Sequence, residues 1–150
     1  MTMRPVFKTS DRGIDNTGKA LVTRQLQQLI DETAAAGGIL LLEEGTYLTA
    51  SLFLGSHMEF RFAQGATLMG TTDETQYPIL PTRAAGIEMD WYPGILNCNN
   101  QTDVVISGPG AIDGQGEYWW NKNWGVDMKG GYRKENDAKG LRWACGYHCM

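Results

Sequence analysis

Hydrophobic positions near the start of the chain recur with a helical period. The set that forms one apolar face is Val22, Leu26, Leu29, Ile30 and Thr33, with Leu21 beside it. This spacing predicts an amphipathic helix of about five turns over residues 18–36. Asn16 or Thr17 would cap its start, and Gly37-Gly38 would end it, because glycine accepts the left-handed conformation of a helix C-terminus. Such a helix must cover an apolar surface.

Beyond Gly38 the pattern changes to short apolar runs, several of them alternating with period two. The runs are residues 39–42, 46–49, 52–54, 58–62, 66–69, 95–96, 104–106 and 111–113. Runs of three to five residues ended by Gly, Asn or Ser predict a coiled all-β architecture with tight corners. Residues 71–94 lack the pattern, and we expect them to form a long loop that projects from one coil.

A weak internal repeat supports stacked coils. Phe60-x-Phe62 is similar to Val104-x-Ile106 at an offset of 44 residues, and Gly65-Ala66-x-Leu68 is similar to Gly110-Ala111-x-Asp113 at an offset of 45. This alignment inserts one residue at the intervening corner. The step of 20 residues from Leu40 to Phe60 would be one coil. Repetition of this kind is typical of solenoids, in which each coil buries its apolar face on the next.

The alternation also predicts which side chains face the interior. We expect the following to point inward: Phe60, Phe62, Leu68, Val104 and Ile106. Glu59, Arg61 and Asp103 should point outward. An ordinary β-sandwich would satisfy the same alternation, so the pattern by itself leaves that alternative open.

Charge and cysteine content restrict the classes of partner. The net charge of −4 argues against a nucleic acid or an anionic membrane as partner. No apolar stretch approaches the ~20 residues of a membrane span, and the first residues lack the apolar core of a signal peptide. We therefore expect a cytoplasmic protein, or a periplasmic or secreted one if a signal has been removed. The three cysteines, Cys98, Cys145 and Cys149, suit free thiols better than a disulfide framework.

Three ordered motifs resemble glycoside hydrolase family 28, the polygalacturonases and their relatives. Residues 36–49, AGGILLLEEGTYLT, are similar to an early coil of that family, with Glu44 where the family often carries proline. Residues 51–71 are similar to the following coil. Residues 106–116, ISGPGAIDGQG, together with Trp119-Trp120, resemble the family's G-x-G-x-hydrophobic-D-G-x-G…W-W motif. The resemblance covers roughly residues 11–124.

This resemblance implies a right-handed parallel β-helix whose open end is capped by the N-terminal helix through Val22, Leu26 and Ile30. It also implies inverting hydrolysis of galacturonide linkages, with a pectic poly- or oligosaccharide as substrate. The family's catalytic aspartates lie in Asn-Thr-Asp and Asp-Asp motifs, and neither motif occurs here. Residues 1–150 would then be the N-terminal part of a single β-helix domain, inactive alone, with the catalytic coils beyond residue 150. A polysaccharide lyase on the same fold and a non-catalytic, tailspike-like or adhesin-like β-helix remain alternatives.

Candidate substrate contacts lie in the projecting loop. Glu88 and Asp90 would share one face of an extended strand, and Trp91 and Tyr92 could stack on sugar rings. The resemblance places this loop on a side wall of the substrate groove in some exo-acting members. Trp119 is a further candidate, with packing beneath a loop as the alternative. Asp113 has the pattern of a turn residue that accepts hydrogen bonds from the backbone after it.

A metal or cofactor site finds little support in the sequence. Cys145, His148 and Cys149, with Cys98, could be zinc ligands, but no second ligand pair at C-x₂₋₄-C spacing accompanies them. The glycines of residues 108–114 do not match a dinucleotide-binding loop. We therefore expect no metal and no cofactor.

Overall fold

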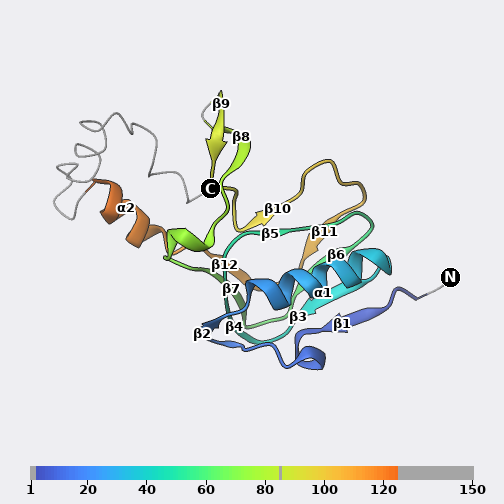
Figure 1. The fold of residues 1–150 in the computed structure, drawn as a ribbon. Coiled ribbons are helices and arrows are strands. Elements are labelled where there is room, and N and C mark those ends of the chain that lie inside the picture. The colour runs from blue at the N-terminus through green and yellow to red at the C-terminus, as the bar shows by residue number, and fades with distance from the viewer. Residues whose placement is uncertain (1–2, 85, 125–150) are drawn as a thin grey trace.

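The computed structural model describes residues 3–84 and 86–124, which wind in successive coils around one apolar interior (Figure 1). Sheet A contains β1 (Val6–Lys8), β3 (Ile39–Leu42), β6 (Glu59–Phe62) and β11 (Val105–Ser107). Sheet B contains β2 (Thr17–Leu21), β4 (Gly45–Thr49), β7 (Ala66–Gly70) and β12 (Ala111–Asp113). Sheet C pairs β5 (Leu52–Phe53) with β10 (Leu96–Asn97). All these pairings are parallel, and the chain visits A, B and C in turn. The predicted right-handed parallel β-helix is confirmed.

The strand register confirms the coil length and corrects the repeat. Phe60 pairs with Leu40, twenty residues earlier, as predicted. Phe60 also pairs with Ile106, and Leu68 with Ile112. The repeat alignment, which set Phe60 against Val104 and Leu68 against Asp113, is therefore wrong. The path from Ile106 to Ile112 is two residues shorter than the path from Phe60 to Leu68, rather than one longer. The first half of the alignment was wrong by two residues, which keeps every side chain on its face, so period-two alternation cannot detect it. The second half was wrong by one residue and set the inward Leu68 against Asp113 instead of Ile112.

The predicted interior is largely observed. Phe60, Phe62 and Leu68 are buried, and Val104 packs partly buried against the same core. Glu59 is half-buried, while Arg61 and Asp103 are exposed on the outside. Ile106 is 52% exposed, although it lies in register with Phe60. It differs because β11 is the last strand of sheet A in the described part of the chain.

Helix α1 (Thr23–Ala35) is shorter than predicted. Leu26, Leu29, Ile30 and Thr33 are buried as expected, and Gly37, with φ of 61°, follows the helix end. The N-cap is Val22, not Asn16 or Thr17, because residues 17–21 pair with β4 as strand β2. The Asp15 carboxylate accepts hydrogen bonds from the Thr17 hydroxyl and from the backbone N–H of Ala20, which holds this segment in a non-helical conformation. Leu21, expected on the apolar helix face, is 41% exposed on the strand.

Helix α1 takes the place of a strand beside β5. The side-chain amide of Gln27 accepts a hydrogen bond from the Phe53 N–H at 2.8 Å and donates one to the Phe53 carbonyl at 2.9 Å. The Thr23 hydroxyl accepts from the Ala50 N–H at 2.8 Å. The buried Val22, Leu26 and Ile30 belong to the core beneath. The helix therefore caps the open end of the coils with both apolar and polar contacts, as predicted.

Most of the non-strand elements leave the coils at the corner after sheet B (Figure 1). Helix α1 follows β2, and α2 (Gly116–Trp124) follows β12. The segment after β7 contains the 3₁₀ helix η2 (Glu74–Gln76) and an antiparallel hairpin of β8 (Leu80–Ala84) and β9 (Ile87–Trp91). The predicted projection of residues 71–94 is observed, but the hairpin within it was not predicted. The other short helix, η1 (Thr9–Arg12), follows β1.

Candidate functional site

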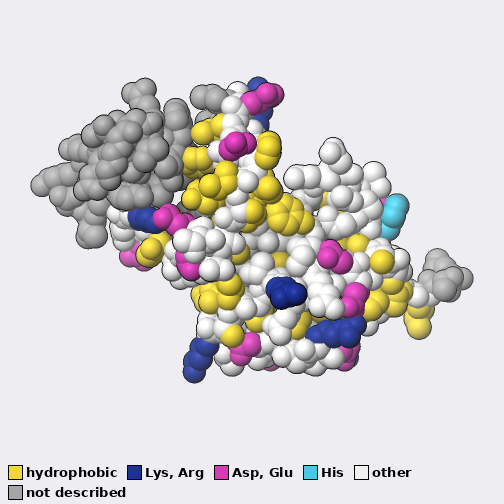
Figure 2. Space-filling model, in the orientation of Figure 1, with side chains coloured by type: hydrophobic (Ala, Val, Ile, Leu, Met, Phe, Trp, Pro, Cys, Tyr) yellow, Lys and Arg dark blue, Asp and Glu magenta, His cyan; other side chains and the backbone are white. Residues whose placement is uncertain are grey.

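Two excursions from neighbouring coils pack against each other at the corner after sheet B. We call them together the corner wall, which comprises residues 71–94 with η2, β8 and β9, and residues 116–124 with α2. The rings of Tyr77 and Trp119 meet edge to face, with centroids 6.4 Å apart. Both are buried together with Ala50, and the half-buried Tyr92 packs against them. Figure 2 shows hydrophobic side chains gathered on the hairpin and at its foot. The wall thus has a small apolar core of its own.

Polar contacts join the same two excursions. Lys122 Nζ on α2 lies 2.6 Å from Glu74 Oε2 on η2 and 5.5 Å from the centroid of the Trp119 ring. The Gln115 side chain donates a hydrogen bond to the Gly70 carbonyl at 2.6 Å. At the foot of the hairpin the buried Tyr77 hydroxyl donates to the Thr71 carbonyl at 2.8 Å, and burial raises the pKa of Tyr77 to about 12.

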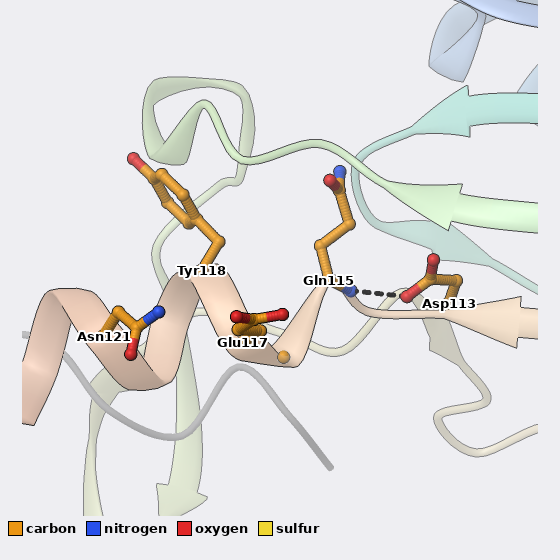
Figure 3. Close-up of a pocket in the computed structure, with 6 residues that line it drawn as sticks. Asp113, Gln115, Glu117, Tyr118 and Asn121 are labelled. Atoms are coloured by element: carbon orange, nitrogen blue, oxygen red, sulfur yellow. Dashed lines mark hydrogen bonds between the residues drawn. The ribbon is translucent and has the colours of Figure 1, made fainter. Parts of the chain in front are cut away.

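A polar hollow of about 490 Å³ opens where β12 leads into α2 (Figure 3). It is lined by Asp113, Gln115, Gly116, Glu117, Tyr118 and Asn121. Asp113 Oδ1 accepts a hydrogen bond from the Gln115 N–H at 2.8 Å, which confirms the turn role predicted for this aspartate. The Tyr118 ring is 45% exposed and stands edge-on to Trp119. Because the described lining offers carboxylates, amides and a phenol but no cation, the hollow suits sugar hydroxyl groups.

The hairpin carries a second polar surface. Glu88 and Asp90 are both exposed on β9, and the extended strand places them on one face, as predicted. Arg83 pairs opposite Glu88, and Pro81 opposite Asp90. With Thr82 and Met89, these residues line a shallow hollow of about 600 Å³. Carboxylates and a guanidinium therefore stand close together on this part of the wall.

Comparison with known proteins shows what this chain is similar to. No family model matches the chain. A Vitis vinifera protein named "Probable polygalacturonase" is 32% identical over 129 residues, which is 79% of this chain and 26% of that protein. A hyperthermoactive exopolygalacturonase from Thermotoga maritima aligns over 92% of this chain and 32% of its own, with a TM-score of 0.75 and 26% identity. The chain is similar to the polygalacturonases of glycoside hydrolase family 28 over most of its length.

A second solved member, the family 28 exopolygalacturonase of Yersinia enterocolitica, aligns over 73% of this chain with a TM-score of 0.66 and 25% identity. That alignment spans 20% of the Yersinia chain. This chain therefore spans about a quarter of the curated relative it matches and a third or less of these two enzymes.

The structure separates the five predicted contact residues into two exposed carboxylates, two buried tryptophans and the half-buried Tyr92. Glu88 and Asp90 are exposed on the hairpin, whereas Trp91 is 9% and Trp119 6% exposed. Trp91 lies on the opposite face of β9 from the two carboxylates, edge-on to Tyr92 with ring centroids 5.8 Å apart. Its buried indole N–H has no hydrogen-bond partner among the described residues. The burial of Trp119 favours the packing alternative for that ring.

Residues that organise the wall escaped sequence analysis. Glu74, Tyr77 and Lys122 lie in no motif, and their partners are 42 to 48 residues away along the chain. Tyr118 lies beside Trp119 and Trp120, and its position in that aromatic run was the one available signal.

The cysteines and the histidine that were weighed as zinc ligands fall mostly outside the described residues. Cys145, His148 and Cys149 lie there, and Cys98 is an exposed free thiol. Within the described ranges, no group of three or more His, Cys, Asp or Glu side chains could hold a metal ion. Among the helices described, none has the length and apolar character needed to cross a membrane.

Proposed function

We propose that the protein containing this chain is a pectin-degrading glycoside hydrolase that cleaves galacturonide linkages with inversion and acts from chain ends. This chain is the N-terminal part of its β-helix. The observation that supports action from chain ends is the corner wall. It projects from the coils at one corner and has its own core, so it can close one end of a groove that runs along later coils. The relatives named exopolygalacturonases support this reading.

The described residues would bind and orient the sugar rather than cleave it. Inversion needs an acid and a base about 6.5–9.5 Å apart so that water fits between them. The family's aspartate motifs are absent from this sequence, so we assign bond cleavage to residues beyond 150. Glu88 and Asp90 accept hydrogen bonds from sugar hydroxyls, and Arg83 across the hairpin pairs with a uronate carboxylate. Tyr92 offers partly exposed ring surface, and Trp91 and Trp119 support it from within.

The experiment compares the full-length protein with residues 1–150 in a reducing-end assay on polygalacturonate and on short oligogalacturonates. We expect turnover by the full-length protein, with products of one length and inverted anomeric configuration by NMR, and none by residues 1–150. Glu88→Gln and Asp90→Asn in the full-length protein should raise KM. Turnover by residues 1–150 that either substitution abolishes would place the active site in this part instead. A full-length protein that releases no reducing ends from galacturonan would refute the proposal.

A further inference from the structure

The hairpin of the corner wall has little attachment of its own. Strands β8 and β9 pair only with each other in the described part of the chain and join none of the sheets of the coil. An isolated two-stranded hairpin is marginally stable in water. Its orientation must therefore be set by the two segments that connect it to the coils.

The returning segment is held by the hairpin's own coil. The Asn97 side chain donates to the carbonyls of Leu52 and Gly94, at 3.0 and 2.8 Å, and accepts from the Gly94 N–H at 2.9 Å. These bonds fix Gly94, two residues before β10 rejoins sheet C, against β5. The returning segment is therefore anchored to its own coil at Gly94.

The outgoing segment is held by the next coil instead. It runs through η2, where Glu74 bonds Lys122 of α2 and Tyr77 packs on Trp119 of α2. The Lys122 side chain is 22% exposed and the Glu74 side chain 35% exposed. A charged hydrogen bond with reduced access to water holds a more definite geometry than a fully exposed pair. The ammonium also lies over the Trp119 ring, so one group contacts both the ionic and the aromatic part of the junction.

We propose that Lys122 is a positioning residue that fixes the β8–β9 hairpin relative to α2 and thereby sets the preference of the enzyme for substrate length. This inference rests on the proposed function, since the hairpin is taken there as the end of the substrate groove. With Lys122 and Glu74 paired, the wall stands at one distance from the cleavage site, and the terminal sugar of a short oligomer contacts it. Without the pair, η2 separates from α2, the hairpin turns about Gly94, and longer chain ends pass it.

The test uses the full-length protein with Lys122→Met, which keeps the length of the side chain and removes the charge. Glu74→Gln breaks the same pair from the other side, in case the first variant folds poorly. Lys19→Met and Glu44→Gln are matched controls, since each removes one charge of the same sign at an exposed site that is not part of the wall. The measurements are kcat and KM on trigalacturonate and on polygalacturonate, the length distribution of products, and hydrogen exchange of the β8 and β9 amides.

In both pair-breaking variants, we expect the ratio of kcat/KM for trigalacturonate to that for the polymer to fall roughly three- to tenfold, mainly through KM. Products of mixed length should appear, and the hairpin amides should exchange faster. The exchanged pair Lys122→Glu with Glu74→Lys should restore most of the preference, and the controls should match the unsubstituted protein. A purely stabilising contact would lower thermal stability without changing length preference, and that outcome would overturn the inference. Lack of any turnover by the unsubstituted protein would instead refute the proposed function, and this inference with it.

Discussion

The Gln27 side chain gives the sharpest test of how α1 closes the end of the β-helix. Its amide makes one hydrogen bond to the N–H and one to the carbonyl of Phe53, at 2.8 and 2.9 Å, and so stands in for a neighbouring strand. Gln27→Met keeps the shape and removes both bonds. A buried backbone group left unpaired costs about 1–3 kcal/mol. Because Gln27 and Phe53 are half-buried, water replaces part of this loss, and we expect the local opening free energy at Phe53 to fall by about 1–3 kcal/mol in total.

The assay is hydrogen exchange of single amides by NMR under conditions where the rate reports the opening equilibrium. A fall of that size makes the Phe53 amide exchange roughly 5- to 150-fold faster. The amides of Leu52 and Leu54 donate to the carbonyls of Ile95 and Asn97 instead, so they serve as internal controls and should keep their rates. Gln27→Glu keeps an acceptor for the Phe53 N–H and should retain much of its protection. An unchanged Phe53 rate in Gln27→Met would show that the edge of β5 does not depend on this side chain.

Two further substitutions test the core and the foot of the hairpin. Phe60→Ala empties a fully buried site and should lower the free energy of unfolding, measured by urea titration, by about 3–5 kcal/mol. Ile79→Ala, at a 62% exposed position, should change it by less than about 0.5 kcal/mol. Similar losses in the two variants would contradict the assigned core. Tyr77 should make the folded state less stable as pH rises from about 10 toward 12, because the unfolded side chain ionises near 10 while burial raises the folded pKa to about 12. Tyr77→Phe should remove that component, so parallel pH profiles of the two proteins above pH 10 would argue against a buried, neutral phenol.

Local patterns were sufficient for the coil and for the buried face of the helix. The spacing of Leu26 and Ile30 and the step from Leu40 to Phe60 each report a single period, and each was confirmed. Period two likewise placed Glu88 and Asp90 on one face of a strand. These predictions succeeded because each depends on residues that are close in sequence or related by one coil.

The errors came from contacts between distant residues. The predicted start of the helix was wrong because Thr17 and Leu21 pair with β4, and no sequence pattern within residues 16–22 indicates that pairing. The hairpin was missed because Pro81 weakens the strand signal of β8, and proline is tolerated there on a two-stranded edge. The junction of Glu74 with Lys122 depends on two excursions meeting in space, which a single sequence does not encode as a pattern.

The unequal corners also bear on how such a protein can change during evolution. Between sheets B and C the chain takes two residues in one coil, from Thr49 to Leu52, and a 25-residue detour in the next, from Gly70 to Leu96, while the ladders of both sheets stay parallel. Closing a longer loop costs little, because the entropic term grows only with the logarithm of its length. Insertions and deletions at this corner can therefore reshape the binding surface while the inward-facing positions remain under separate constraint. A lineage could explore new substrates here by changing loop length alone, without passing through an unfolded ancestor.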